Sequence, residues 1–383
     1  MSKAWLIWGG ATLVVFSLVG FGGWVFSLPS ATAAAEAPGV PQEEMDAVLA
    51  SLQPPKRERP LIAIIGINDA TETTDYLMPA GILRRADIAD VMMLATGPGP
   101  VQLYPALKIE PDATIAAFDA AHPQGADYVI VPAMEPHDDP AALAWIRSQA
   151  EKGATIVSVC VGATVVGAAG LLDGRRATTH WYFLRQLRAE TPTVRYVADR
   201  RMVIDGTIAT TTGITLSMPM MLTLIEAIAG QAKAEAVAHD LGVDTWDMRH
   251  ASAAFMLTRP FATTVLTNRI SFWNREELGV RLEPGMDEVS LAPVADAWSR
   301  TYRSNATSYA GSPAAVVTKY GVRVTPDRVG TDWPEGRDVL TFSDRMPADA
   351  LHLVLDAITA RYGARTADVV AMQLEYPRPT TDQ

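Results

Sequence analysis

The stretch TIVSVCVGATVVGAAGLL, residues 155–172, contains the single cysteine of the 383-residue chain, Cys160. The β-branched residues before this cysteine favour a buried strand, and the Gly and Ala residues after it favour a helix that packs closely on a sheet. The thiol is therefore predicted to lie at a strand-to-helix turn. In a doubly wound sheet, the carboxyl ends of the strands border the crevice in which ligands bind.

The segments around this stretch alternate between strand and helix patterns. Buried strands are predicted at 60–67, 90–97 and 126–134, and helices at 77–89 and 140–153. This alternation is typical of an α/β fold, in which a doubly wound, mostly parallel sheet has flanking helices on both faces. We assign residues 60–245 to this domain and residues 36–59, which mix Pro and charge, to a linker.

The first 35 residues have the composition of a membrane-targeting segment. No charged residue occurs from 4 to 35, and the apolar run 5–26 would be about 33 Å long as a helix, enough to cross a membrane. We predict a single-pass transmembrane anchor with a cytoplasmic N-terminus and extracytoplasmic domains. The alternative is a signal segment cleaved after Ala33 or Ala35, which would leave a secreted or periplasmic protein.

The composition argues against several classes of function. The formal net charge of −11 disfavours a nucleic-acid partner, because phosphate binding needs clustered Lys and Arg. One cysteine cannot form an intramolecular disulfide, and Cys160 has no Cys or His neighbour at zinc-site spacing. We therefore expect no metal and no other cofactor. The thiol is either buried and inert, or activated by the N-terminus of the following helix, which would lower its pKa.

The segment VCVGATVVGAAGLLDGRRATTHW, residues 159–181, resembles the nucleophile elbow of the ThiJ/PfpI superfamily. The similarity extends over about residues 60–242. It is greatest to the branch that contains isonitrile hydratases and the amidase-like sensor domains of some transcription regulators. The resemblance implies the flavodoxin-like fold of the class I glutamine amidotransferases, a small-molecule substrate or ligand, and a nucleophilic role for Cys160.

The resemblance also implies roles for an acid and a histidine. In the family, an acidic residue four positions before a proline contacts the nucleophile; here Asp75 precedes Pro79, and Glu72 is a secondary candidate. His180 matches a histidine that lies near the nucleophile in some members, where it would act as general acid or base. The alternatives are a solvated loop carboxylate for Asp75 and a structural histidine for His180. Cys160, Asp75 and His180 are thus the catalytic candidates.

The residues expected to contact substrate or an oxyanion depart from the family pattern. Ala133 and Met134 replace a Pro-Gly-Gly turn whose backbone N–H completes the oxyanion hole, and Val161 replaces a threonine. Gly162 would let the helix begin close to the strand. Losing one oxyanion donor typically costs about 3 kcal/mol of transition-state stabilisation. A hydrolase or hydratase of small carbonyl, amide or isonitrile-like substrates is one interpretation; a weakened ligand-binding or redox-sensing module is the other.

The C-terminal part, residues 255–383, repeats part of the first domain. GMDEVSLAPVADAWSRT (285–301) tracks DATETTDYLMPAGILRR (69–85), and YGVRVTPDR (320–328) tracks PALKIEPDA (105–113). The segment that would correspond to Cys160 and His180 is missing from this second copy. The family's regulators have a basic helix-turn-helix domain after the first domain, and this chain has no such basic segment.

This second copy is too short to cover a sheet of its own. We expect an opening strand at 261–273 and a closing strand at 336–342. We also expect the copy to pack on the first one as a pseudo-dimer, where a homodimer partner would lie in relatives. The alternative is that the two parts share only general α/β patterning.

Overall fold

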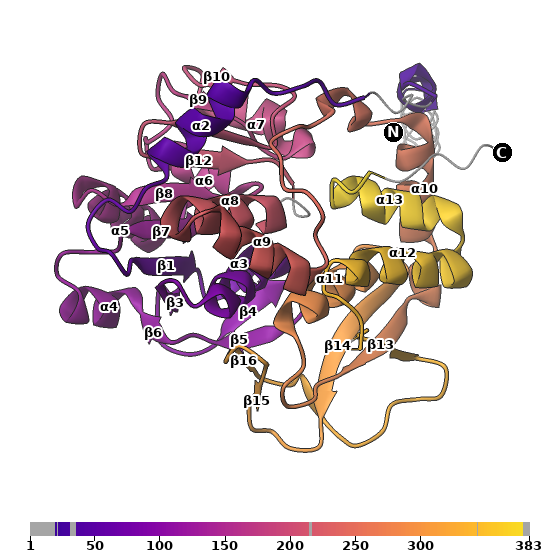
Figure 1. Ribbon diagram of the computed structural model, residues 1–383. Coiled ribbons are helices and arrows are strands. Elements are labelled where there is room, and N and C mark those ends of the chain that lie inside the picture. Colours follow the sequence, from indigo (N-terminus) through magenta and orange to yellow (C-terminus); the bar gives the residue numbers. More distant parts are fainter. Residues whose placement is uncertain (1–19, 21, 31–35, 214–216, 343, 378–383) are drawn as a thin grey trace, which may run out of the picture.

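The computed structural model describes residues 20–377 except 21, 31–35, 214–216 and 343 (Figure 1). The predicted anchor, residues 5–26, lies largely outside this part. Within the described part, no helix has the length and apolar character needed to span a membrane.

The main sheet of the described N-terminal half is seven-stranded, in the order β11-β12-β8-β7-β1-β3-β6. Its strands are β1 (Leu61–Gly66), β3 (Asp90–Ala95), β6 (Ala113–Thr114), β7 (Tyr128–Val131), β8 (Thr155–Ser158), β11 (Met202–Asp205) and β12 (Ile208–Thr211). Neighbouring strands are parallel, apart from the antiparallel pair β11–β12. The predicted α/β fold with a mostly parallel sheet is confirmed.

Helices cover both faces of this sheet (Figure 1). One face packs against α2 (Gln42–Ser51), α3 (Thr73–Ala86), α8 (Ser217–Ala229) and α9 (Gln231–Leu241), and the other against α4 (Ile115–Ala121), α5 (Pro140–Glu151), α6 (Gly162–Ala168) and α7 (Leu184–Glu190). Successive residues of β1 point to opposite faces, so Ile62 and Ile64 join one apolar core while Ala63 and Ile65 join the other. The short strands β9 (Arg176–Ala177) and β10 (Arg195–Tyr196) form a separate parallel pair.

The C-terminal half has a smaller parallel sheet in the order β17-β14-β13-β18. The elements are β13 (Glu276–Arg281), α11 (Glu288–Ser299), β14 (Ser304–Ala310), β17 (Arg328–Val329), β18 (Asp338–Val339), α12 (Asp349–Tyr362) and α13 (Ala364–Gln373). The predicted closing strand at 336–342 is present in part as β18. The apolar face of α11 packs on α3, and apolar side chains of both halves share one core.

The expected opening strand at 261–273 is wrong, because α10 (Arg259–Ile270) occupies most of this segment. The Thr258 hydroxyl caps the helix by accepting a hydrogen bond from the Phe261 N–H, and Pro260 lies in the first turn, where its missing N–H costs nothing. The β-branched residues of this segment suggested a strand, but these start signals favour a helix. The opening strand is β13 instead.

A third sheet joins the two halves. Its order is β15-β16-β5-β4-β2, with β2 (Asp69–Glu72), β4 (Val101–Tyr104) and β5 (Lys108–Glu110) from the first half and β15 (Val316–Val317) and β16 (Arg323–Val324) from the second. Strands β5 and β16 pair antiparallel, with Ile109 opposite Val324. Backbone hydrogen bonds therefore supplement the α3–α11 packing between the halves.

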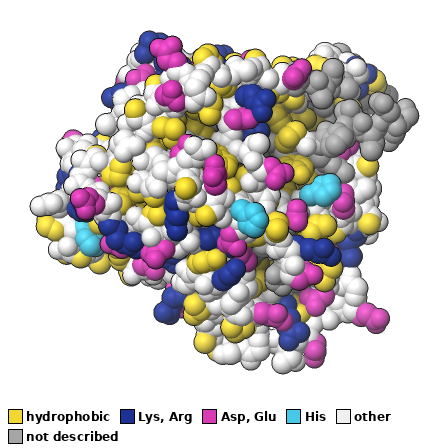
Figure 2. Space-filling view, in the orientation of Figure 1, with side chains coloured by type: hydrophobic (Ala, Val, Ile, Leu, Met, Phe, Trp, Pro, Cys, Tyr) yellow, Lys and Arg dark blue, Asp and Glu magenta, His cyan; other side chains and the backbone are white. Residues whose placement is uncertain are grey.

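Charged side chains of both signs are interspersed over the face shown in Figure 2, with apolar side chains between them. Arg323 and Glu110 form an exposed ion pair that joins the two halves at the surface. Exposed pairs contribute at most about 1 kcal/mol. The buried contacts between the halves therefore dominate their association.

Candidate functional site

Cys160 lies at a sharp turn between β8 and α6. Its φ of 56° is in the left-handed region, which residues other than glycine rarely adopt. The Cys160 N–H donates to Thr211 Oγ1 (3.2 Å), and Thr179 Oγ1 donates to the Cys160 carbonyl (3.1 Å). Two neighbouring segments thus hold the backbone in a strained conformation, as is typical of a nucleophile elbow.

Gly162 permits the close approach of α6 to the end of β7. A Cβ built on Gly162 would lie 2.1 Å from the Val131 carbonyl oxygen, a distance that real Cβ atoms do not show. The glycine is therefore required for the helix to begin where it does, directly after Cys160.

Two carboxylates lie at the start of α3. Glu72 is the N-cap, and its Oε2 accepts hydrogen bonds from the Asp75 N–H (2.7 Å) and Thr74 Oγ1 (2.8 Å). Asp75 is thus in the first turn of a helix and fully buried, not on a solvated loop. Its Oδ2 accepts from the Ala133 N–H (3.1 Å), and its Oδ1 has no hydrogen-bond partner among the described residues.

The environment of Asp75 favours its protonated form. Burial, followed by the adjacent Glu72 carboxylate, raises the pKa of Asp75 well above its ordinary value, although the Ala133 N–H and Arg300 oppose this shift. A protonated carboxyl in this position can donate a proton at neutral pH.

The Cys160 sulfur is buried among charged groups, and its side chain is only 2% exposed. Burial raises the pKa of the Cys160 thiol well above its ordinary value, and Asp75, Glu72 and Glu375 act in the same direction, while Arg300 opposes them. Of the two alternatives for this cysteine, a buried and inert thiol or one activated by the helix N-terminus, this environment favours the buried thiol.

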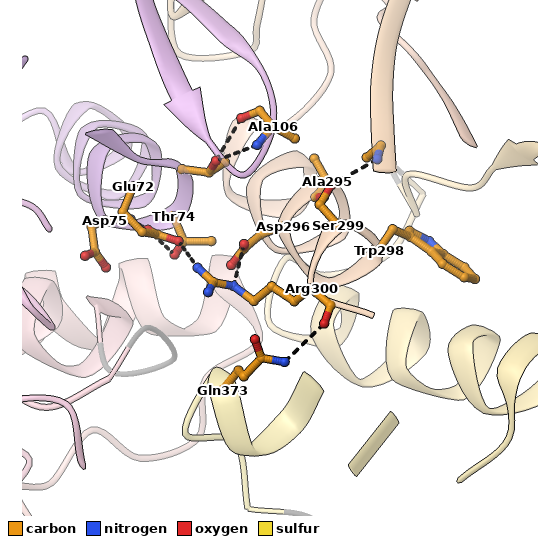
Figure 3. Close-up of polar contacts among 12 residues, drawn as sticks. Glu72, Thr74, Asp75, Ala106, Ala295, Asp296, Trp298, Ser299, Arg300 and Gln373 are labelled. Carbon is orange, nitrogen blue, oxygen red and sulfur yellow. Dashed lines mark hydrogen bonds and ion pairs between the residues drawn. The ribbon is translucent and has the colours of Figure 1, made fainter. Parts of the chain in front are cut away.

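Arg300, which the sequence did not identify, reaches this site from the end of α11 (Figure 3). Its Nη2 donates to Glu72 Oε1 (2.7 Å) and its Nε to Asp296 Oδ1 (2.6 Å), with 14% of the side chain exposed. Burial lowers the pKa of Arg300, but Asp296 and Glu72 more than compensate and raise it, so the guanidinium stays charged. Gln373 of α13 supports this placement through a hydrogen bond from Nε2 to the Arg300 carbonyl (3.1 Å).

His180 is buried, and both of its ring nitrogens face backbone groups. Nδ1 accepts from the Tyr182 N–H (3.3 Å), so the proton is assigned to Nε2, which donates to the Gln373 carbonyl (3.0 Å). Burial lowers the pKa of His180 and favours the neutral ring. In this arrangement the imidazole links the short helix η1 (Trp181–Phe183) to the end of α13, which is a positioning role.

The chain segment after α13 also enters the site, and the sequence did not identify it either. Glu375 is 1% exposed, and its carboxylate accepts hydrogen bonds from the Trp181 N–H (Oε1, 2.7 Å) and the Gly213 N–H (Oε2, 2.6 Å). Nothing in the local pattern around Glu375 distinguishes it from a surface glutamate, because its partners are distant in sequence.

Of the other predicted contact residues, one backbone donor is already occupied and two side chains lie in or against the apolar cores. The Ala133 N–H is engaged by Asp75, the Met134 side chain packs in an apolar core, and Val161 is half-buried against the other core. Within the described ranges, no three His, Cys, Asp or Glu side chains gather in a metal-binding arrangement. The residues brought together are thus a buried thiol, a carboxylic acid and an ion-paired arginine.

Comparisons with known proteins agree with this architecture. The family model described as the DJ-1/PfpI family matches residues 62–227. Isonitrile hydratase of Pseudomonas putida is 42% identical over 101 residues, which are 26% of this chain and 42% of that protein. The HTH-type transcriptional regulator CdhR of Pseudomonas aeruginosa is 31% identical over 147 residues, which are 38% of this chain and 42% of the regulator. The chain thus spans less than half the length of these two relatives.

Solved structures align with about half of the chain. DJ-1beta of Drosophila melanogaster has a TM-score of 0.43 at 24% identity, covering 49% of this chain and 100% of that one. A ThiJ/PfpI family protein from Pseudomonas syringae has a TM-score of 0.44 at 22% identity, covering 55% of this chain and 83% of that one. The resemblance to the ThiJ/PfpI superfamily is confirmed by the family match: residues 62–227 are a domain of the DJ-1/PfpI family.

Proposed function

We propose that this protein is a cysteine-dependent hydratase or hydrolase that acts on small carbonyl, amide or isonitrile-like substrates. Cys160 is the nucleophile and Asp75 the general acid. The observation that carries this proposal is the buried Asp75 carboxyl, whose Oδ1 has no partner among the described residues and whose pKa burial raises well above its ordinary value. The identity to isonitrile hydratase over 101 residues supports the class of reaction.

An isonitrile, R–N≡C, illustrates the proposed steps. Asp75 delivers its proton to the terminal carbon while the Cys160 sulfur bonds to the same carbon, and the thiol proton passes to the Asp75 carboxylate. This forms a thioimidate, R–N=CH–S–Cys160. Water then adds to the carbon, the C–S bond breaks, and the sulfur regains a proton as the formamide R–NH–CHO leaves.

Turnover assays on the full chain test this proposal. With small isonitriles or amides as substrates, we expect Cys160→Ser and Asp75→Asn each to lower kcat by at least about 100-fold, the typical contribution of a positioned acid or base. Asp87→Asn is the matched control, since the Asp87 side chain is 81% exposed and its αL backbone tolerates Asn. Turnover that survives Cys160→Ser would contradict the proposal.

A ligand-binding module without turnover is the second candidate. The occupied Ala133 N–H and the 2% exposure of Cys160 favour it, because one expected oxyanion donor is already engaged and the nucleophile is closed to solvent in this conformation. Redox sensing has less support, since susceptibility to oxidation follows thiolate character and exposure. Ligand binding by a wild-type protein that turns over none of the isonitriles or amides would favour this candidate.

We also propose that the C-terminal half takes the place of a second subunit. Arg85 at the end of α3 contacts Asp287 at the start of α11, while Arg300 at the end of α11 contacts Glu72 at the start of α3. Strands β5 and β16, which occupy matching places in the tracked stretches, pair with each other. Reciprocal contacts of this kind are expected across a twofold interface, and they support an internal pseudo-dimer.

We further propose that residues 5–26 tether the protein to a membrane with its domains outside the cytoplasm. The support is the uncharged apolar run of the sequence. Cell fractionation combined with determination of the mature N-terminus tests this. An intact N-terminus in the membrane fraction is expected. A chain beginning after Ala33 or Ala35 would indicate a cleaved signal segment, and an intact cytosolic chain would contradict export.

A further inference from the structure

The Glu375 carboxylate lies in a cradle built from the two segments that hold the nucleophile elbow. Its donors are the backbone N–H groups of Trp181 and Gly213. Trp181 is two residues after Thr179, which donates to the Cys160 carbonyl, and Gly213 is two residues after Thr211, which accepts from the Cys160 N–H. The cradle and the sulfur are therefore parts of one structural unit.

The cradle fits a carboxylate in charge and in shape. Two N–H groups from separate segments each bind one oxygen, and hydrogen bonds to an ionised acceptor are about twice as strong as neutral ones. A Cβ on Gly213 would lie 2.7 Å from the Glu375 Cβ, so glycine leaves the space that the acidic side chain fills. A third neighbour is His250, whose Nε2 lies 4.0 Å from Glu375 Oε2.

We propose that the Trp181 and Gly213 N–H groups form a carboxylate-binding subsite of the Cys160 site, which Glu375 occupies in this closed form. The substrate or ligand is then a small molecule that carries a carboxylate, and it binds in place of the Glu375 side chain. This inference rests on the proposed function, because it names the substrate class of the same site.

Glu375 has an advantage over any free carboxylate because it belongs to the same chain. A tethered group acts at an effective concentration of the order of millimolar or more, so a free ligand must exceed this to compete. Displacement of Glu375 also removes a contact between the segment after α13 and the His180–Trp181 segment, whose neighbour Thr179 donates to the Cys160 carbonyl. Ligand entry and exposure of the thiol are thereby linked.

The test measures alkylation of Cys160 by iodoacetamide in full-length variants, with propionate and its uncharged analogue propionamide as probes. In Glu375→Ala the cradle is vacant, so we expect labelling at least tenfold faster than in the wild type. Propionate should slow this labelling in a saturable manner, while propionamide should not. Glu283→Ala, in which an exposed glutamate is removed, is the matched control and should label at the wild-type rate.

A second variant covers the case in which Glu375→Ala does not fold. Gly213→Ala keeps Glu375 but places a methyl group 2.7 Å from its Cβ, so it should expel the side chain and accelerate labelling as well. Urea unfolding of each variant shows whether faster labelling reflects local opening or global unfolding. Equal effects of propionate and propionamide, or faster labelling explained by global unfolding, would overturn the subsite.

These readouts do not depend on turnover. If propionate protects Cys160 from alkylation in a protein that has no hydratase or hydrolase activity, the proposal of the subsite stands and only the proposed function is contradicted. Turnover without carboxylate protection would contradict only the subsite.

Discussion

Cys160 is held in a backbone conformation that its own side chain disfavours, and the hydroxyls of Thr211 and Thr179 maintain it. Such strain is stored where surrounding contacts over-determine the backbone, as at nucleophile elbows. The sulfur is buried, and Asp75 and Arg300 are among the charged groups that act on it. The chemistry at this residue is consequently that of a buried thiol and a nearby acid whose pKa values are both raised.

Iodoacetamide labelling of Cys160 should show a pH midpoint above the ordinary thiol pKa of about 8.5. Burial and the neighbouring carboxylates raise the pKa of the thiol, so the thiolate forms only as the pH rises through this higher value. Labelling rates between pH 6 and 11, followed by mass spectrometry, measure the midpoint. Asp75→Asn should move it down, because Asp75 is one of the groups that raise the pKa of the thiol; a wild-type midpoint well below 8 would refute the prediction.

Gly162→Ala should lower the free energy of unfolding by about 3 kcal/mol, the upper part of the usual range for overpacking. The added methyl group would lie 2.1 Å from the Val131 carbonyl oxygen, so α6 would have to move away from β7. Gly311→Ala is the control, because its Cβ would meet nothing closer than 3.9 Å. Urea denaturation measures the free energy of unfolding of both variants. Similar losses of this free energy in the two variants would count against this packing argument.

The antiparallel pair α3 and α11 brings the second half of the chain to the site. Each helix ends in an arginine that contacts an acidic residue at the start of the other helix. Gly81 allows this contact, since a Cβ there would lie 2.6 Å from Glu288 Cγ. The packing of α3 on α11 therefore joins the two halves and also places the Arg300 guanidinium beside Glu72.

Arg300→Met should destabilise the fold by about 3 to 5 kcal/mol, because it leaves Glu72 and Asp296 buried without their counter-charge. Arg323→Met is the matched control: its ion pair with Glu110 is exposed and should be worth less than about 1 kcal/mol. Urea midpoints of the two variants are compared with the wild type. A loss for Arg300→Met no greater than for Arg323→Met would contradict the importance of the buried pair.

The two halves share a core and a sheet, so the molecule does not divide cleanly after the DJ-1/PfpI domain. Leu77 and Leu83 of α3 lie in the same apolar cluster as Val289 and Val294 of α11. The strand β5 keeps β4 but loses β16 if the second half is absent, which leaves one edge of β5 unpaired. The C-terminal half therefore covers apolar surface and a strand edge of the first half.

A chain ending after residue 245 should be insoluble or should self-associate. The truncation exposes the apolar face of α3 and the edge of β5, and exposed surfaces of this kind favour association. Light scattering after size-exclusion chromatography measures the mass of any soluble product. A stable monomer that unfolds cooperatively would show that the first half is independent.

Much of the first half could be predicted, since buried parallel strands such as β1 are continuous apolar runs and α5 has local start signals in Asp139 and Pro140. The segment that became α10 could not be predicted correctly from its β-branched residues. For that segment, the cap at Thr258 and the first-turn Pro260 outweighed strand propensity. The start of α3 was also missed, because Glu72 caps the helix with its own side chain.

The sequence by itself determined the alternation of the main strands and helices in the first half, the turn at Cys160 and the family of the first domain, because these depend on residues close together along the chain. Only the tertiary structure decided that burial raises the pKa of the thiol and that Arg300 and Glu375 are among the charged groups that act on it. The physical reason is that the pKa of a group depends on its burial and on the charged groups near it. Here those groups come from a distant half of the chain.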